Sequence, residues 1–224
     1  MPNRPLLLGH RGARAEKSIP ENTVDSFDLA LAHRCDGFEF DVRLSADRQP
    51  VICHDANIRG LEVAQTSAQH LGLPILREIL QRYQRTAFLD IELKVSGLER
   101  ITLELLRSCP PTRGYVVSSF LPEILQVIHD LNPSIPLGLI CQTPAQFRAW
   151  PTVAVEYVIL QRNLVRLTNI RRIQTSGKKI FVWTVNAASE MKRFAGWGVD
   201  GIVSDDPKRL AALIDRRPKF QGKT

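Results

Sequence analysis

The sequence predicts an α/β fold, and within that class a TIM-type (β/α)8 barrel. Apolar, strand-like segments alternate with helix-like segments along the chain, a pattern typical of parallel βα units. Eight strand positions can be counted, which is the number that closes such a barrel. No internal repeat or linker divides the 224 residues. We therefore expect one domain over residues 1–216, followed by a basic C-terminal tail, 217–224, that is disordered.

The N-terminal part predicts the first two barrel strands. The apolar segment Leu6–Leu8 ends in Gly9-His10-Arg11-Gly12, and a helix is expected to start near Asn22 or Thr23, since either residue is a good N-cap. The segment Gly37–Leu44 alternates apolar and polar side chains with a period of two, as a strand does. A turn leads from it to the apolar segment 51–53, and the two pieces are counted as one barrel position.

The remaining elements alternate regularly between strand and helix, except that residues 59–72 have no clear period and are expected to form a loop. The expected strands are 87–95, 114–120, 137–141, 155–160, 180–185 and 201–204. The expected helices are 73–83, 98–109, 121–131, 144–150, 164–177, 187–197 and a last one that begins at Pro207.

Composition excludes several classes of protein. No apolar run approaches the roughly 18–20 residues that a membrane-spanning helix needs, and the Leu6–Leu8 run is too short for a signal-peptide core. We therefore expect a cytoplasmic protein without stable membrane insertion. The four cysteines form no CxxC pair, which favours reduced, buried thiols. The formal charge of +7 could attract anions, but no basic motif with interleaved aromatic residues supports a nucleic-acid partner. The oligomeric state is not predicted.

Acidic side chains follow the second predicted strand. Glu39 and Asp41 point from the same face, about 7 Å apart along the chain. They could bind one hard divalent cation, or they could form the solvent-exposed face of a half-buried strand. In a TIM barrel, side chains at the C-terminal ends of the strands meet at one mouth. Polar or aromatic residues stand at the expected ends of several strands, namely His10, Glu39, Asp41, Glu92, Lys94, Trp183, Asn186 and Asp205.

Together these groups suggest cleavage of a phosphodiester. The carboxylates of Glu39, Asp41 and Glu92 suit a hard cation such as Mg²⁺ or Ca²⁺, with water in the remaining positions. Arg11 and Lys94 supply positive charge for phosphoryl oxygens. His10 and His54 offer a base for the attacking oxygen and an acid for the leaving alkoxide.

The sequence also resembles the glycerophosphodiester phosphodiesterase family. The resemblance is carried by ordered motifs along nearly the whole chain: Gly9-His10-Arg11-Gly12, Pro20-Glu21-Asn22-Thr23, Glu39-Phe40-Asp41-Val42, Val51-Ile52-Cys53-His54-Asp55, Ile91-Glu92-Leu93-Lys94, Ser119-Phe120, Trp183-Thr184-Val185-Asn186 and 201–207. It implies a TIM barrel and one divalent cation, Mg²⁺ or Ca²⁺ with Mn²⁺ as an alternative, on Glu39, Asp41 and Glu92. It also implies a His10/His54 acid–base pair.

The same resemblance implies the reaction and further site residues. The substrate would be a small glycerophosphodiester, such as the choline or ethanolamine diester, hydrolysed to sn-glycerol 3-phosphate and an alcohol through a cyclic phosphate. Arg11 and Lys94 would contact the phosphate, and Trp183 would line the glycerol side unless it is a core aromatic residue. Glu21 matches a position near the metal, although Glu21 and Asn22 could instead anchor the first helix. Asp55 could orient His54 or only turn the loop.

The chain departs from the family in the segment after the second barrel strand. Many members carry a longer insertion there, whereas this chain has only residues 56–73. A short or absent lid predicts a broad range of head groups, and selectivity above about 100-fold, or roughly 2.7 kcal/mol, would contradict this. Two other functions stay open: lysophospholipase D-like or phospholipase-like activity on lipid diesters, and a non-catalytic phosphate-binding module.

Overall fold

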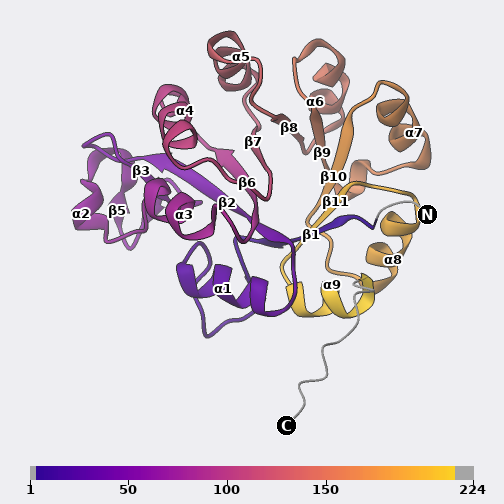
Figure 1. Ribbon diagram of the computed structural model, residues 1–224, viewed down its shortest axis with the longest axis horizontal. Coiled ribbons are helices and arrows are strands. Elements are labelled where there is room, and N and C mark those ends of the chain that lie inside the picture. Colours follow the sequence, from indigo (N-terminus) through magenta and orange to yellow (C-terminus); the bar gives the residue numbers. More distant parts are fainter. Residues whose placement is uncertain (1–3, 215–224) are drawn as a thin grey trace.

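A computed structural model describes residues 4–214 and shows a closed barrel of eight parallel strands (Figure 1). The barrel strands are β1 (Leu6–His10), β2 (Gly37–Leu44), β6 (Phe88–Leu93), β7 (Tyr115–Ser119), β8 (Leu137–Cys141), β9 (Tyr157–Gln161), β10 (Lys179–Trp183) and β11 (Gly201–Ser204). Strand β1 closes the sheet because it pairs in parallel with both β11 and β2. The predicted (β/α)8 barrel is confirmed, while the tail predicted at 217–224 lies outside the described residues.

Helices surround the barrel (Figure 1). They are α1 (Val24–Ala32), α3 (Leu76–Tyr83), α4 (Glu99–Ser108), α5 (Pro122–Leu131), α6 (Pro144–Ala149), α7 (Leu167–Thr175), α8 (Ala188–Gly196) and α9 (Pro207–Ile214), with 3-10 turns at Trp150–Thr152 and Arg162–Leu164. Helix α1 begins where its sequence favours it, because the Thr23 side chain accepts a hydrogen bond from the backbone N–H of Ser26. Helix α3 shows how such a helix buries an apolar stripe, since its buried residues are Leu76, Ile79, Leu80 and Tyr83.

The segment after β2 differs from its prediction. Strand β3 (Pro50–Ile52) pairs antiparallel with β2 and lies outside the barrel. Residues 59–72, predicted as a loop, contain β5 (Leu61–Glu62), a 3-10 turn (Val63–Gln65) and helix α2 (Ala68–Leu71), and β5 pairs with β4 (Asn57–Ile58). The loop prediction is therefore wrong in part. These elements are too short to show a period, and they pack on a small separate cluster, Val51, Cys53, Val63 and Leu71.

Two apolar layers place the polar site. The large core lies between the sheet and the helices, where the rings of Phe27 and Phe38 stack with centroids 4.2 Å apart. A second cluster fills the barrel interior, and it includes Phe88, Tyr157 and Phe181. Alternation along β2 sends Phe38 to the helices and the intervening carboxylates to the interior. The face of β2 that carries Glu39 and Asp41 therefore points into the barrel. The alternative that it is a solvent-exposed face is wrong.

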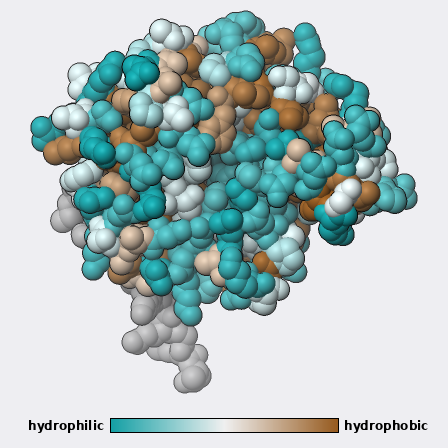
Figure 2. Space-filling view, turned by 180° about the vertical axis from the view of Figure 1, so that it is seen from behind, coloured by the Kyte–Doolittle hydropathy of each residue, from teal (hydrophilic) through white to brown (hydrophobic). Residues whose placement is uncertain are grey.

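The structure also bears on what composition predicts for the cysteines, for membrane-spanning helices and for the surface. The four cysteines, Cys35, Cys53, Cys109 and Cys141, are buried and form no disulfide bond, as expected. Within residues 4–214, every helix is too short or too polar to cross a membrane. The face in Figure 2 is mostly hydrophilic, with its apolar residues in separate patches. The large apolar side chains that are exposed in the described chain are Val127, Leu131 and Leu167.

Candidate active site

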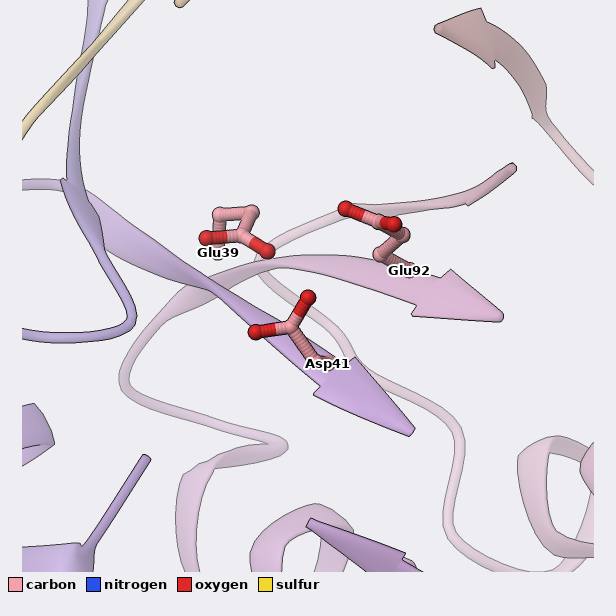
Figure 3. Close-up of side chains that lie close together, drawn as sticks. All are labelled: Glu39, Asp41 and Glu92. Atoms are coloured by element: carbon pink, nitrogen blue, oxygen red, sulfur yellow. The ribbon is translucent and has the colours of Figure 1, made fainter. Parts of the chain in front are cut away.

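Three carboxylates meet inside the mouth of the barrel (Figure 3). Glu39 and Asp41 come from β2 and Glu92 from β6, and the strand register pairs Asp41 directly with Glu92. One oxygen of each group lies within 4.8 Å of the others. The side chains are nearly removed from water, with exposed fractions of 6%, 1% and 7% for Glu39, Asp41 and Glu92. The three predicted metal ligands are therefore neighbours in a buried site.

The electrostatics of this cluster are unfavourable without a cation. Burial raises the pKa of Glu39 well above its usual range, and repulsion from Asp41 and Glu92 adds to this. Burial and Asp41 raise the pKa of Glu92 to about 7. Burial acts in the same direction on Asp41, but the charges of Lys94 and Arg11 outweigh it and hold the pKa of Asp41 below its usual value. A bound cation would favour the ionised form of all three groups.

The donor set fits a hard divalent cation. Among the described residues, these three carboxylates are the only group of three acidic, histidine or cysteine side chains close enough to share a metal ion. All the offered donor atoms are oxygens, which Mg²⁺ and Ca²⁺ prefer. The Oε1 atom of Glu39 is buried and has no hydrogen-bond partner, so a cation would satisfy an otherwise unpaired oxygen.

Arg11 and Lys94, the predicted phosphate contacts, lie beside the carboxylates. Lys94 Nζ lies 2.5 Å from Glu92 Oε1 and 3.3 Å from Asp41 Oδ1. Arg11 Nε lies 3.3 Å from Asp41 Oδ2. The backbone at Arg11 has a positive φ of 50°, and its N–H donates to Glu39 Oε2 at 3.0 Å. This strained conformation turns the backbone itself toward the carboxylate cluster.

The loop between β1 and α1 supports the site through Glu21 and Asn22. Glu21 accepts hydrogen bonds from Arg11 Nη1 at 2.7 Å and from Arg14 Nε at 2.6 Å, so it orients Arg11. Asn22 is buried, has a φ of 59°, and donates from Nδ2 to Asp41 Oδ2 at 2.9 Å. The interpretation of Asn22 as a helix cap is wrong, because Thr23 is the cap and Asn22 holds a predicted metal ligand.

His10, at the end of β1, is fixed by an acidic partner from the far end of the chain. Its Nδ1 lies 2.6 Å from Asp205 Oδ1, and its Nε2 lies 3.8 Å from Glu39 Oε2. Burial opposes ionisation of Asp205, but the hydrogen bond and charge of His10 outweigh it and lower the pKa of Asp205 to about 2. Asn186 Nδ2 donates to the other Asp205 oxygen at 2.6 Å. Because Nδ1 is engaged, Nε2 is the nitrogen turned toward the carboxylate cluster.

His54 lies nearer the rim. Its Nδ1 is 2.7 Å from Asp55 Oδ1, which agrees with the orienting alternative for Asp55. Arg43 Nε donates to the backbone carbonyl of His54 at 2.7 Å and fixes the loop from behind. Burial lowers the pKa of His54, and the negative charge of Asp41 and the hydrogen bond with Asp55 offset part of this shift.

One cavity of about 360 Å³ joins these groups and has a polar and an apolar side. Its polar side includes His10, His54 and two carboxylates of the triad, Glu39 and Glu92. Its apolar side is formed by Phe120, Ile140, Ile159, Trp183 and Val203. Trp183 packs edge-on against Phe120, with ring centroids 5.6 Å apart, and so lines the cavity instead of being hidden in the core. Its buried Nε1 atom has no hydrogen-bond partner.

Asp90 is a cavity residue that sequence reasoning did not select. It lies on β6, is 1% exposed, and accepts a hydrogen bond from Ser118 Oγ at 2.6 Å. Burial raises its pKa to about 7, and Glu92 contributes to this. The sequence feature that could have identified Asp90 is its position two residues before Glu92, on the same face of the strand.

A mouth that fixes cationic side chains beside a carboxylate site for a metal suits an anionic phosphate ester, and acid–base groups in the same cavity suit its hydrolysis. These features define a TIM-barrel hydrolase of phosphate esters. The chain belongs to the glycerophosphoryl diester phosphodiesterase family, whose sequence profile matches residues 10–110 and 92–209. The expected family and the expected class of enzyme are thereby confirmed.

Relatives and solved structures agree with this assignment. The Bacillus subtilis protein YhdW is 32% identical over 90% of this chain and 94% of its own length. A glycerophosphodiester phosphodiesterase of Caldanaerobacter subterraneus subsp. tengcongensis is 26% identical over 93% of this chain and 97% of its own. A phosphodiesterase structure from Oleispira antarctica, in complex with the product sn-glycerol-3-phosphate, superposes with a TM-score of 0.83 at 24% identity, covering 95% and 97% of the two chains.

Proposed function

We propose that this protein hydrolyses small glycerophosphodiesters, such as glycerophosphocholine and glycerophosphoethanolamine, to sn-glycerol 3-phosphate and an alcohol, with one divalent cation as cofactor. The observation that carries this proposal is a buried carboxylate triad beside a cavity of about 360 Å³ that is lined by two of its members, Glu39 and Glu92, and by two histidines. The product bound in the structurally similar Oleispira antarctica enzyme supports the same substrate class.

Glu39, Asp41 and Glu92 would hold the cation, for which Mg²⁺ and Ca²⁺ are the first candidates and Mn²⁺ the next. When bound, such an ion polarises a phosphoryl oxygen and stabilises the charge that develops there. Arg11 and Lys94 lie beside Asp41, so both would add positive charge beside the phosphate. The wall formed by Trp183 and Phe120 offers the glycerol carbons an apolar surface.

His10 has the geometry of a general base. Asp205 holds its Nδ1 and stabilises the imidazolium that forms when Nε2 accepts a proton. In the first displacement, a glycerol hydroxyl of the substrate attacks phosphorus and loses its proton to His10. A new P–O bond forms within the glycerol phosphate as the P–O bond to the alcohol breaks.

His54 has the geometry of the general acid. It lies nearer the rim than His10, where an alcohol can leave, and it donates a proton to the departing oxygen. The neighbouring carboxylate of Asp55 supports the protonated form. In the second displacement, water attacks the cyclic phosphate and His54 takes the proton from that water. The P–O bond to the glycerol oxygen that attacked in the first displacement breaks, and His10 returns its proton to that oxygen. Both histidines then have their starting protonation states.

A coupled assay tests the proposal. The purified protein is incubated with glycerophosphocholine, and released sn-glycerol 3-phosphate is oxidised by its dehydrogenase. EDTA should abolish release, and Mg²⁺, Ca²⁺ or Mn²⁺ should restore it. If no ion supports release, lysophosphatidylcholine is tested next for the lipid-directed alternative. Failure with both substrates would contradict the proposed activity and favour a non-catalytic phosphate-binding module.

A further inference from the structure

A second cavity, of about 370 Å³, lies beside the catalytic one. Its walls come from the loop before α1, represented by Pro20 and Glu21, and from the short segment after β3, represented by Ile58 and Leu73. Among the described residues that line the two cavities, His54 is the one they share. The residue proposed above as the general acid therefore lines both spaces.

We propose that this side cavity binds the alcohol portion of the diester and that its acidic rim favours an alcohol carrying an ammonium group. The inference rests on the proposed function. In the proposed mechanism the glycerol phosphate end lies in the first cavity, beside His10 and the carboxylate triad. The leaving oxygen must lie within hydrogen-bond reach of His54, so the alcohol carbons continue past His54 into the space on its other side.

A third cavity near His54 is a less suitable place for the alcohol than the side cavity. This cavity, lined by Arg43 and Arg48, does not include the His54 side chain among its lining residues. The hydrogen bond that Arg43 donates to His54 goes to the backbone carbonyl and not to the imidazole. An alcohol held there would lie behind the loop and away from the imidazole, so the side cavity is the better continuation of the substrate path.

The lining of the side cavity fits a small amino alcohol. Ile58 and Leu73 offer apolar surface for methylene or methyl groups. Three lining side chains are charged: Glu21, Asp55 and Arg59. Both carboxylate oxygens of Glu21 already accept hydrogen bonds from Arg11 and Arg14, so the acidic group left at the rim is Asp55. Arg59 Nη2 donates to the backbone carbonyl of Leu71, which directs the guanidinium to the segment's own backbone. The Asp55 side chain is 74% exposed, and its carboxylate is therefore accessible to an ammonium group at the rim.

Filling the cavity tests the location of the alcohol. Ile58→Trp and, separately, Leu73→Trp should lower kcat/KM for glycerophosphocholine at least about tenfold. Both should leave kcat/KM for the methyl ester of sn-glycerol 3-phosphate within about twofold, because a methyl group does not reach the new side chain. Leu167→Trp, at an exposed site on α7, is the matched control and should change neither value. A thermal-unfolding midpoint close to that of wild type shows, independently of activity, that a variant is folded.

The two possible failures give different results. If wild type hydrolyses neither ester with any cation, the proposed function fails. Two outcomes with an active wild type overturn the inference, because both mean that the side cavity does not hold the alcohol. In one, a folded variant loses activity on both esters equally; in the other, it keeps full activity on both.

A pair of isosteric substrates tests the preference for charge with wild type alone. The choline ester is compared with the 3,3-dimethylbutyl ester, in which a carbon replaces the ammonium nitrogen. The choline ester should react with a kcat/KM about two- to fivefold higher at low ionic strength, the range expected for one exposed ion pair. The ratio should approach one at about 0.5 M salt because exposed charges are then screened. Equal values at low salt would overturn the proposed acidic selectivity.

Discussion

Replacing Glu39 by Gln should stabilise the cation-free protein while weakening its response to a divalent cation. The ligand oxygens lie within 4.8 Å of one another, and two unit charges at that distance repel by about 3.5 kcal/mol at an effective dielectric constant of about 20. The raised pKa of Glu39 means that a proton already relieves part of this repulsion. We therefore expect a gain of about 1–2 kcal/mol, or about 2–4 °C per kcal/mol in the unfolding midpoint.

The pH dependence of this gain has a defined sign. The folded-state pKa of Glu39 is raised above the unfolded value, so the folded protein loses stability as pH rises through that pKa. The Gln side chain has no such titration. The stability difference between Glu39→Gln and wild type should accordingly be larger at pH 9 than at pH 6.

Thermal unfolding with EDTA and then with cation provides the assay. At a cation concentration 100 times its Kd, wild type should gain about 2.7 kcal/mol. If the substitution weakens binding by about 100-fold or more, the variant should gain about 0.4 kcal/mol or less at the same concentration. Asp90→Asn is the matched control, since it removes a buried carboxylate outside the triad and should keep the cation response. Equal cation-induced shifts in wild type and Glu39→Gln would refute the ligand assignment.

Three further predictions concern residues around the triad. His10→Ala should lower kcat by about 10²- to 10⁴-fold in the coupled assay yet keep the cation-induced rise in the unfolding midpoint; normal turnover would remove His10 from the mechanism. The lowered pKa of Asp205, about 2, means that its stabilisation is present above about pH 4 and is lost as pH falls toward 2, so acid unfolding monitored by circular dichroism should show a weaker pH dependence over this window in Asp205→Asn. Asn22→Ala removes the donor to Asp41 and leaves a non-glycine residue at positive φ, so chemical denaturation should show a loss of about 1–3 kcal/mol; an unchanged midpoint would show that this hydrogen bond contributes nothing.

The barrel could be predicted because each β-strand carries its own local signal. The alternation along Gly37–Leu44 identified a strand and placed Glu39 and Asp41 on one face. It did not show that this face is the interior, since that follows from closure of the sheet by β1. The segment after β3 had no comparable signal, because its elements are short and its cluster contains only four fully buried apolar residues among those described.

The site was predicted where residue type and strand position were sufficient. The three carboxylates could be selected because each stands near the end of a predicted strand. His10 and His54 were selected in the same way, and both line the cavity beside the carboxylates. The contacts that hold these groups depend on long-range packing. Asp205 reaches His10 across 195 positions because β1 pairs with β11, and Asn22 reaches Asp41 from an unusual backbone conformation. Neither pairing has a local sequence signal.

The most direct test of the account follows the fate of oxygen during hydrolysis of glycerophosphocholine. The reaction is run in ¹⁸O-labelled water with the activating cation, and the products are analysed by ³¹P NMR and mass spectrometry. We expect sn-glycerol 3-phosphate with one labelled oxygen on phosphorus, unlabelled choline, and no reaction in EDTA. Phosphocholine and glycerol as products, label in the choline hydroxyl, or the same rate in EDTA would contradict it.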